Sequence, residues 1–260
     1  MSKSKPPKIL LLDIETAPII AHVWKLWDNN VGLNQIEHDW FILSWSAKWL
    51  DSKKVFYQDL RGKVKKRCDK SLLKGLWKLL DEADIVLHQN GKKFDIPKIN
   101  ARFVINGFKP TSHYRQLDLR DIVKKNFGFT SGKLEYITNT LNTKYKKLKH
   151  NKFAGHDMWT ECLKDNIKAW REMEKYNKHD VLSLEESYKI LRAWDNTINF
   201  QVYHEQNENK CDCGSFVVRK KGFRYTTVGK YQNYQCQTCG KNWQGKHNLL
   251  TTIKKRDMFK

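Results

Sequence analysis

The stretch KILLLDIETAP, residues 8–18, joins an apolar run to two carboxylates. Four consecutive apolar residues, 9–12, are typical of a strand that is buried on both faces. Because residues i and i+2 of a strand point to the same side, Asp13 and Glu15 should converge at its carboxyl end. Two anions held together in a core are costly unless a cation neutralises them or one is protonated. The pair alone is a weak signal, so its meaning depends on whether further acids join it.

A second acid follows another predicted buried strand. In DIVLHQNGKKFDIPKINARF, residues 84–103, the strand at 85–87 leads through a turn at Gly91 to Asp95. Pro97 stands where proline is common, near the first turn of a helix. Asp95 by itself could equally be the N-cap of that helix.

The third segment is WREMEKYNKHDVLSLEESYKILRAW, residues 170–194, which predicts an amphipathic helix. Its apolar stripe recurs at three- and four-residue spacing and consists of Met173, Val181, Leu184, Tyr188 and Leu191, with Asn177 continuing it. Tyr176 and Asp180 are four positions apart and therefore neighbours on one face. Without the other segments, they would be interpreted as a surface pair beside the stripe.

Together the segments form the pattern D-x-E, N-x3-F-D and Y-x3-D. In this pattern the chain resembles the DEDD exonuclease superfamily, in its subgroup with tyrosine in the third motif, over roughly residues 8–195. The histidine form would need histidine at the position of Lys175. The resemblance implies an α/β fold of the RNase H-like kind, a mixed β-sheet flanked by helices. Stretches 42–49, 116–125 and 133–142 fit this fold as a second strand and supporting elements.

The resemblance also implies a role for each motif residue. Asp13 would bridge two divalent ions, Glu15 and Asp180 would complete the site of the ion that bears the nucleophile, and Asp95 would hold the other ion. Two such ions, about 3.5–4 Å apart, can clamp the attacking and leaving oxygens of a phosphodiester. Carboxylates suit Mg²⁺ or Mn²⁺. Tyr176 would orient the attacking water, since a phenol with a pKa of about 10 is a poor base.

Several neighbours of the motifs have two interpretations. Asn90 could position the second-motif loop or contact nucleic acid, although a turn-forming asparagine explains it equally well. Lys92 and Lys93 depart from the pattern by standing directly before Phe94; they could contact phosphates, although lysines on a turn are more often solvated. Asp118 and Asp121 are additional acids for which a capping or solvated role is favoured.

The charge of the chain points to a polyanionic partner. Forty-nine Lys and Arg against 28 Asp and Glu give a net charge of +21, with a pI of about 9.6. Nucleic acid is the simplest such partner for a phosphoryl-transfer site, although a nucleotide bias toward A and T would also enrich lysine and asparagine. Basic clusters at 62–67 and 143–152 should make binding strongly salt-dependent.

Tryptophan is abundant, with ten residues in the chain. Five of them follow the first motif: Trp24, Trp27, Trp40, Trp45 and Trp49. Most should belong to the core or line the site, while one or two could stack on 3′-terminal bases.

No stretch of 18 apolar residues and no signal peptide is evident, and residues 1–8 form a short polar lead. These features predict no membrane partner and a cytoplasmic protein, acting in the host cytoplasm if it is viral.

Four of the six cysteines lie in CDCGSFVVRKKGFRYTTVGKYQNYQCQTCGKNWQGK, residues 211–246. Paired cysteines in a cytosolic protein more often bind metal than form disulfides. The segment resembles a zinc ribbon of the kind found in DNA-handling proteins, which implies one structural Zn²⁺ held by Cys211, Cys213, Cys236 and Cys239. Gly214 and Gly240 would allow the tight turns, and strands are expected at 215–220 and 230–236. The first pair departs from the pattern, being C-x-C rather than C-x2-C.

The ribbon could bind nucleic acid or dock a protein. A basic surface with interleaved Phe223 and Tyr225 favours nucleic acid, and its cations are Arg219, Lys220, Lys221 and Arg224. The predicted organisation is an RNase H-like domain at 1–196, a linker at 197–209, and the ribbon with a basic tail at 210–260. Metal binding should provide most of the folding free energy of so small a module.

The leading hypothesis is a two-metal-dependent 3′–5′ exonuclease that releases nucleotides from DNA, preferably from single-stranded 3′ ends. The direction and the exo mode come from the resemblance, since the residues themselves indicate only metal-dependent phosphodiester hydrolysis. The alternatives are a 3′–5′ exoribonuclease, a structure-specific endonuclease, and a non-catalytic nucleic-acid-binding protein.

Overall fold

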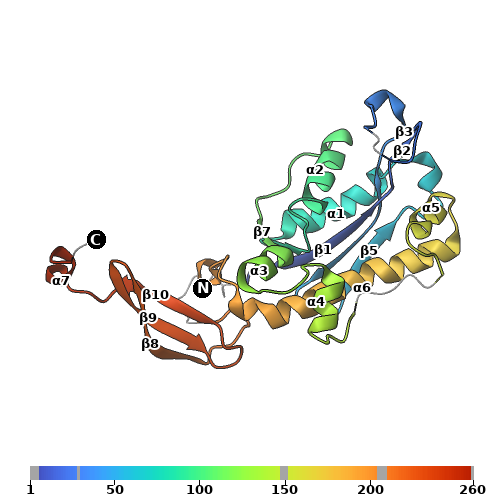
Figure 1. The fold of residues 1–260 in the computed structure, drawn as a ribbon. Helices are drawn as coiled ribbons and strands as arrows, with labels where there is room; N and C mark the ends of the chain where they lie inside the picture. Colours follow the sequence, from blue (N-terminus) through green and yellow to red (C-terminus); the bar gives the residue numbers. More distant parts are fainter. Residues whose placement is uncertain (1–5, 28–29, 147–151, 204–209, 259–260) are drawn as a thin grey trace.

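The computed structural model describes residues 6–27, 30–146, 152–203 and 210–258. Its centre is a five-stranded mixed sheet in the order β5-β4-β1-β6-β7 (Figure 1). The strands are β1 (Ile9–Thr16), β4 (Ile42–Trp49), β5 (Val55–Asp59), β6 (Ile85–His88) and β7 (Arg115–Asp118). Central β1 pairs antiparallel with β4 and parallel with β6. The predicted buried strand is confirmed, but it continues past residue 12 because β4 pairs with it as far as Thr16.

Helices cover both faces of the sheet. They are α1 (Lys70–Glu82), α2 (Asp95–Ile105), α3 (Leu119–Asn126), α4 (Leu134–Thr140), α5 (Asp157–Leu163) and α6 (Ile167–Leu191). Alternation along β1 divides the core, since Leu10 and Leu12 pack with residues of α1 and α2, whereas Ile9 and Leu11 pack with residues of α3, α4 and α6. This arrangement is the expected RNase H-like α/β fold.

The long helix α6 presents the predicted apolar stripe to the sheet. Asn166 caps its start by accepting a hydrogen bond from the amide of Lys168, and a 3₁₀ turn, η3 (Arg192–Trp194), follows its end. Tyr176 and Asp180 are both buried. The interpretation of these two residues as a surface pair is therefore wrong, because the buried face of α6 is wider than the stripe.

Residues beyond α6 build a separate three-stranded antiparallel sheet in the order β10-β9-β8. Its strands are β8 (Val218–Thr226), β9 (Gly229–Cys236) and β10 (Asn242–Asn248), and a short helix α7 (Thr252–Arg256) follows. In Figure 1 this sheet lies apart from the five-stranded sheet. β8 starts three residues later than predicted and extends farther, to a turn that joins it to β9.

The segment between the two sheets is not uniformly loose. Within the predicted linker 197–209, Ile198 and Phe200 are buried in the same core as Leu191, and a 3₁₀ turn, η4 (Phe200–Tyr203), follows. Residues 204–209 lie outside the described residues, as do 147–151 of the second basic cluster and 1–5 of the polar lead. The domain boundaries stay a prediction.

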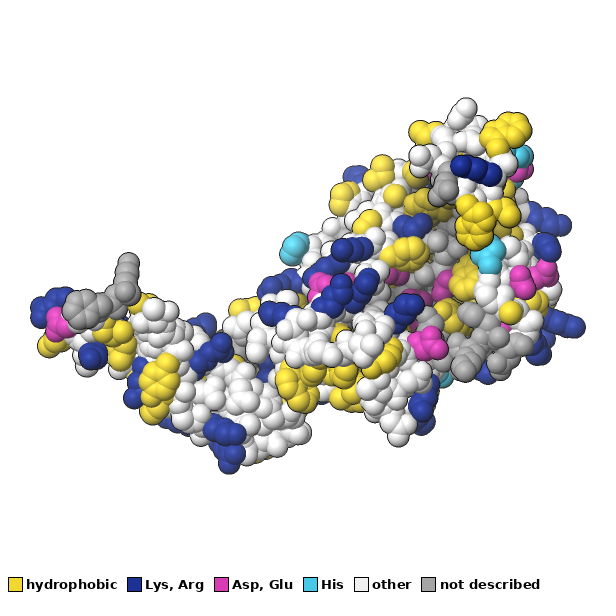
Figure 2. All heavy atoms as spheres, in the orientation of Figure 1, with side chains coloured by type: hydrophobic (Ala, Val, Ile, Leu, Met, Phe, Trp, Pro, Cys, Tyr) yellow, Lys and Arg dark blue, Asp and Glu magenta, His cyan; other side chains and the backbone are white. Residues whose placement is uncertain are grey.

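On the face that Figure 2 draws, Lys and Arg side chains are spread over both the larger part of the chain and the smaller part that follows α6. Among the described helices, none combines the length and the apolar character needed to cross a membrane.

A buried carboxylate ties three elements together beside β4. Asp69, at the start of α1, is fully buried and accepts a hydrogen bond from the amide of Ile42 at 2.9 Å. The guanidinium of Arg102 on α2 donates to it through Nε at 2.7 Å and Nη2 at 2.9 Å. Paired in this way, the carboxylate can stay charged in the core.

We expect Asp69→Asn to lower the free energy of unfolding by about 3–5 kcal/mol, because it leaves the Arg102 charge without its anion. Urea denaturation would measure the change. Asp121→Asn is the matched control, since Asp121 forms a 2.7 Å ion pair with Lys92 between exposed side chains and should cost about 1 kcal/mol or less. Equal losses in the two variants would contradict the structural role of Asp69.

Candidate active site and cysteine cluster

Three predicted carboxylates meet where α6 crosses β1. Asp13 and Glu15 come from β1 and Asp180 from α6, and one oxygen of each lies within 4.8 Å of the others. The D-x-E pair converges as expected because residues 13 and 15 lie on the face of β1 that α6 covers. This geometry fits a cation, because three neighbouring anions on partly or fully buried positions repel one another unless positive charge lies between them.

Two hydrogen-bond donors that the sequence did not reveal as site residues orient the carboxylates. Asn177, fully buried on α6, donates through Nδ2 to Oδ2 and to the backbone oxygen of Asp13, while its Oδ1 accepts from Ser44 at 3.3 Å. Trp159 on α5 donates from Nε1 to Oε2 of Glu15 at 2.9 Å. An asparagine within an apolar stripe was a visible signal for Asn177, whereas nothing in the local sequence marked Trp159.

Tyr176 lies beside the carboxylates, one helical turn before Asp180. Its phenol is hydrogen-bonded to Asp180, and its ring meets that of Trp159 edge to face at a centroid distance of 6.3 Å. Burial raises the pKa of Tyr176 far above its usual range, and the charges of Asp180, Glu15 and Asp13 raise it further. The phenol therefore keeps its proton at neutral pH, and the role of Tyr176 in orienting water stays a prediction.

Asp95 contacts the backbone of β1 from the start of α2. It is the first residue of α2 rather than its N-cap, which is Phe94, and its Oδ1 accepts a hydrogen bond from the amide of Ile14 at 3.1 Å. Burial raises its pKa to about 6. Asp95 thus touches the peptide between Asp13 and Glu15 but lies outside the group of three carboxylates within 4.8 Å.

The loop before Asp95 is held by Asp118. This buried carboxylate, the N-cap of α3, accepts hydrogen bonds from the amides of Asn90 at 2.8 Å and Arg120 at 2.9 Å. Burial opposes its charge, yet hydrogen bonds from His88 and from the amide of Asn90 lower its pKa. The favoured capping role of Asp118 is therefore confirmed.

One residue of that loop stabilises the turn, and two others are exposed at the surface. Asn90 has a positive φ of 64°, and its Oδ1 accepts from Nη1 of Arg120 at 2.6 Å, so it fixes the turn. Lys92 is paired with exposed Asp121 at 2.7 Å, and Lys93 is exposed. Phosphate contacts by Asn90, Lys92 and Lys93 stay a prediction.

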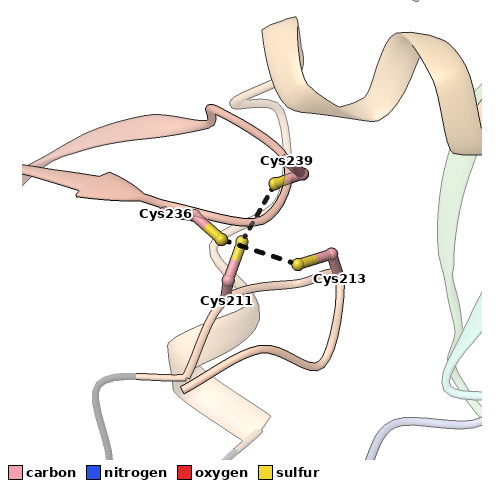
Figure 3. A group of neighbouring side chains, drawn as sticks. All are labelled: Cys211, Cys213, Cys236 and Cys239. Atoms are coloured by element: carbon pink, nitrogen blue, oxygen red, sulfur yellow. Dashed lines mark hydrogen bonds between the residues drawn. The ribbon is translucent and has the colours of Figure 1, made fainter. Parts of the chain in front are cut away.

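The four cysteines of the C-terminal segment form the second cluster (Figure 3). The Sγ atoms of Cys211 and Cys239 are 3.5 Å apart, and those of Cys213 and Cys236 are 3.7 Å apart. A tetrahedron with Zn–S bonds of about 2.3 Å has edges of about 3.8 Å, so these sulfurs suit a four-thiolate metal site. The C-x-C spacing therefore does not prevent the sulfurs from converging.

The surroundings of the cluster favour a thiolate at Cys236, whereas burial raises the pKa of Cys211 and of Cys239. Burial alone would raise the pKa of Cys236, but hydrogen bonds from the amides of Cys239 and Thr238 lower it to about 6. Gly214 and Gly240 follow their cysteines with φ of 88° and 79°, a backbone conformation that favours glycine. The expected tight turns are confirmed.

The predicted basic surface of the C-terminal segment lies along β8. Arg219, Lys220, Lys221 and Arg224 are all exposed, as are Phe223 and Tyr225. Nζ of Lys230 on β9 lies 4.0 Å from the ring centroid of Phe223. These features suit nucleic acid, and binding there stays a prediction.

The fold and the acidic site define a class of nucleic-acid enzymes in which carboxylates on a central strand and a crossing helix converge. A model of the RNase_H superfamily matches residues 10–192, so the chain belongs to that superfamily. Its members are mostly metal-dependent nucleases. No curated protein matches the sequence.

We expect Asn177→Leu, which keeps the volume but removes the donor to Asp13, to weaken Mn²⁺ binding about 10-fold, because a partner that orients a ligating carboxylate contributes to metal affinity. Titration of Mn²⁺ followed by electron paramagnetic resonance would measure the dissociation constant. The control is Asn126→Leu, whose Nδ2 donates to the carbonyl oxygen of Ile122 on α3. Unchanged affinity in Asn177→Leu would exclude this orienting role.

Proposed function

We propose that the protein is a two-metal-dependent 3′–5′ exonuclease that hydrolyses DNA, with a preference for single-stranded 3′ ends. The observation that carries the proposal is the meeting of Asp13, Glu15 and Asp180 within 4.8 Å. Tyr176 lies beside Asp180 and completes the Y-x3-D motif on α6. The sheet order and the match to the RNase_H superfamily support the same class of chemistry.

Asp13, Glu15 and Asp180 would hold divalent ions, Mg²⁺ or Mn²⁺, with Asp95 contributing from the side of α2. Bound there, such ions neutralise the developing charge on the phosphodiester oxygens and make hydroxide available at neutral pH. Asn177 keeps the Asp13 carboxylate in one orientation, and Trp159 does the same for Glu15.

Tyr176 would orient the attacking water. Its protonated phenol donates to Asp180, and its oxygen still carries lone pairs that can accept a hydrogen bond from water. The edge-to-face contact with Trp159 limits the rotation of the ring. The water is thereby directed by a neutral group whose position depends on α5 and α6.

The C-terminal segment would be a zinc ribbon that holds one structural Zn²⁺ and contacts DNA through β8. Among the described residues 210–258, the buried hydrophobic residues are Cys211 and Cys236. An apolar core of this size cannot stabilise three strands, so a metal that joins the four thiolates would provide the missing free energy. The cations along β8 would bind phosphates without sequence preference.

Incubation with labelled oligonucleotides tests the exonuclease. With Mg²⁺ or Mn²⁺ we expect mononucleotides to be released from the 3′ end of single-stranded DNA, and we expect Asp13→Ala to lower the rate at least about 100-fold, because the three-carboxylate site is lost. Single-stranded RNA and circular single-stranded DNA are tested in parallel. Preferential digestion of RNA would indicate an exoribonuclease, internal cleavage of the circle would indicate an endonuclease, and no difference between Asp13→Ala and the unaltered chain would exclude the site.

Metal analysis tests the ribbon. We expect about one zinc per chain, and we expect Cys236→Ser to lose it, because a hydroxyl is a poor replacement for a thiolate ligand. Mass spectrometry of the purified protein would count the metal. Cys68→Ser is the matched control, since Cys68 is an exposed cysteine outside the cluster. Zinc retained in full by Cys236→Ser would contradict the four-cysteine site.

A further inference from the structure

An arm that consists of the described residues 19–27 and 30–38 projects from the end of β1 (Figure 1). Its base is a two-stranded sheet of β2 (Ile20–Ala21) and β3 (Ile36–His38). The amide of His22 donates to the carbonyl of Gln35 at 2.9 Å, and a 3₁₀ turn, η1 (Leu33–Gln35), precedes β3. Backbone hydrogen bonds between its two strands therefore give the arm a defined structure where it joins the sheet domain.

The arm exposes large apolar side chains that are not buried in the core of the protein. Trp24 is 98% exposed and Trp27 80%, with Leu26 at 85% and Leu33 at 87%, whereas Trp45 of β4 is 3% exposed and belongs to the core. Figure 2 shows hydrophobic side chains gathered on this projection. Soluble proteins rarely expose several large apolar residues together unless the surface binds something.

The base of the arm follows the acidic residues of β1 closely in the chain. Ile20 follows Glu15 by five positions, and since an extended chain spans at most about 3.6 Å per residue, the two Cα atoms lie within about 18 Å of each other. Trp40 follows β3 by two residues, and Nζ of Lys98 lies 3.7 Å from its ring centroid and 5.1 Å from that of Phe94. Phe94 directly precedes Asp95 of the second motif. The contacts of Lys98 with the rings of Trp40 and Phe94 therefore join the end of the arm to that motif.

We propose that the arm is a binding site for single-stranded nucleic acid, in which unpaired bases stack on Trp24 and Trp27 and the strand passes Trp40 and Lys98 to the carboxylates. An indole offers a flat surface that stacks on any base. The net charge of +21 favours a polyanion over an ordinary protein surface, and Lys98 supplies a cation where phosphates would pass. The inference rests on the proposed exonuclease function for the direction of the strand.

Binding is measured by fluorescence anisotropy of a labelled single-stranded DNA in the Asp13→Ala background without added Mg²⁺ or Mn²⁺, so that hydrolysis plays no part. We expect the double variant Trp24→Ala, Trp27→Ala to bind at least about 10-fold more weakly. The double phenylalanine variant, which keeps aromatic rings, should bind within about threefold of the background, while the double leucine variant should bind as weakly as the alanine one. Trp194→Ala, which removes another exposed tryptophan, should leave affinity unchanged.

A strand with abasic sites keeps its phosphates but offers no bases to stack. We expect it to bind equally weakly to the background protein and to the double alanine variant. Normal DNA affinity in either the alanine or the leucine variant overturns the proposal. A change in oligomeric state of the alanine variant by light scattering, with unchanged DNA affinity, also overturns it and identifies the arm as an interface between copies of the chain.

Hydrolysis is followed separately with the unaltered chain, so the two proposals can fail independently. If the unaltered chain degrades DNA while the arm variants bind normally, only the arm site is wrong. If the arm variants lose binding while the unaltered chain with Mg²⁺ or Mn²⁺ degrades nothing, the nucleic-acid site stands and the exonuclease is wrong.

Discussion

The crossing of β1 by α6 is the contact on which both the fold and the acidic site depend. At this crossing Asn177 binds Asp13 through its side-chain amide, and farther along α6 the buried ion pair of Lys48 and Glu185 joins the helix to β4 at 2.6 Å. Apolar residues of α6 on either side exclude water from these polar contacts. A shift of α6 by one residue would move Asp180 about 100° around the helix axis and away from Asp13. The packing of α6 against the sheet therefore also determines the geometry of the acidic site.

The two sheets of the chain are stabilised by different means. The five-stranded sheet has an apolar core on each face, and its buried charges are paired, as Asp69 is with Arg102. The three-stranded sheet is exposed along nearly all of β8, and its buried centre is the cysteine cluster with the ion pair of Lys241 and Asp212 beside it. Removal of the zinc proposed for this cluster would therefore unfold the second sheet without changing the first.

The sequence predicted the parts of the site that have local patterns. A run of apolar residues ending in D-x-E and a helical stripe with Y-x3-D are each short-range signals, and both elements form where expected. The contributions of Trp159 and Asn177 could not be predicted in the same way, because a hydrogen bond between residues 144 positions apart, such as that from Trp159 to Glu15, depends on tertiary packing. The same limit applies to the tryptophans after the first motif, since alternation predicts which face a strand residue takes but not that Trp24 and Trp27 stand on a projecting arm.

The exposed lysines and arginines of β8 and the exposed indoles of the arm would contribute to binding in different ways. Contacts between lysines and phosphates weaken as salt rises, because bound counterions are released when the complex forms. Stacking on an indole changes little with salt, since it depends on apolar area and on dispersion between flat rings. A nucleic-acid strand held by both kinds of contact would therefore stay stacked on the arm at salt concentrations that weaken its phosphate contacts with β8.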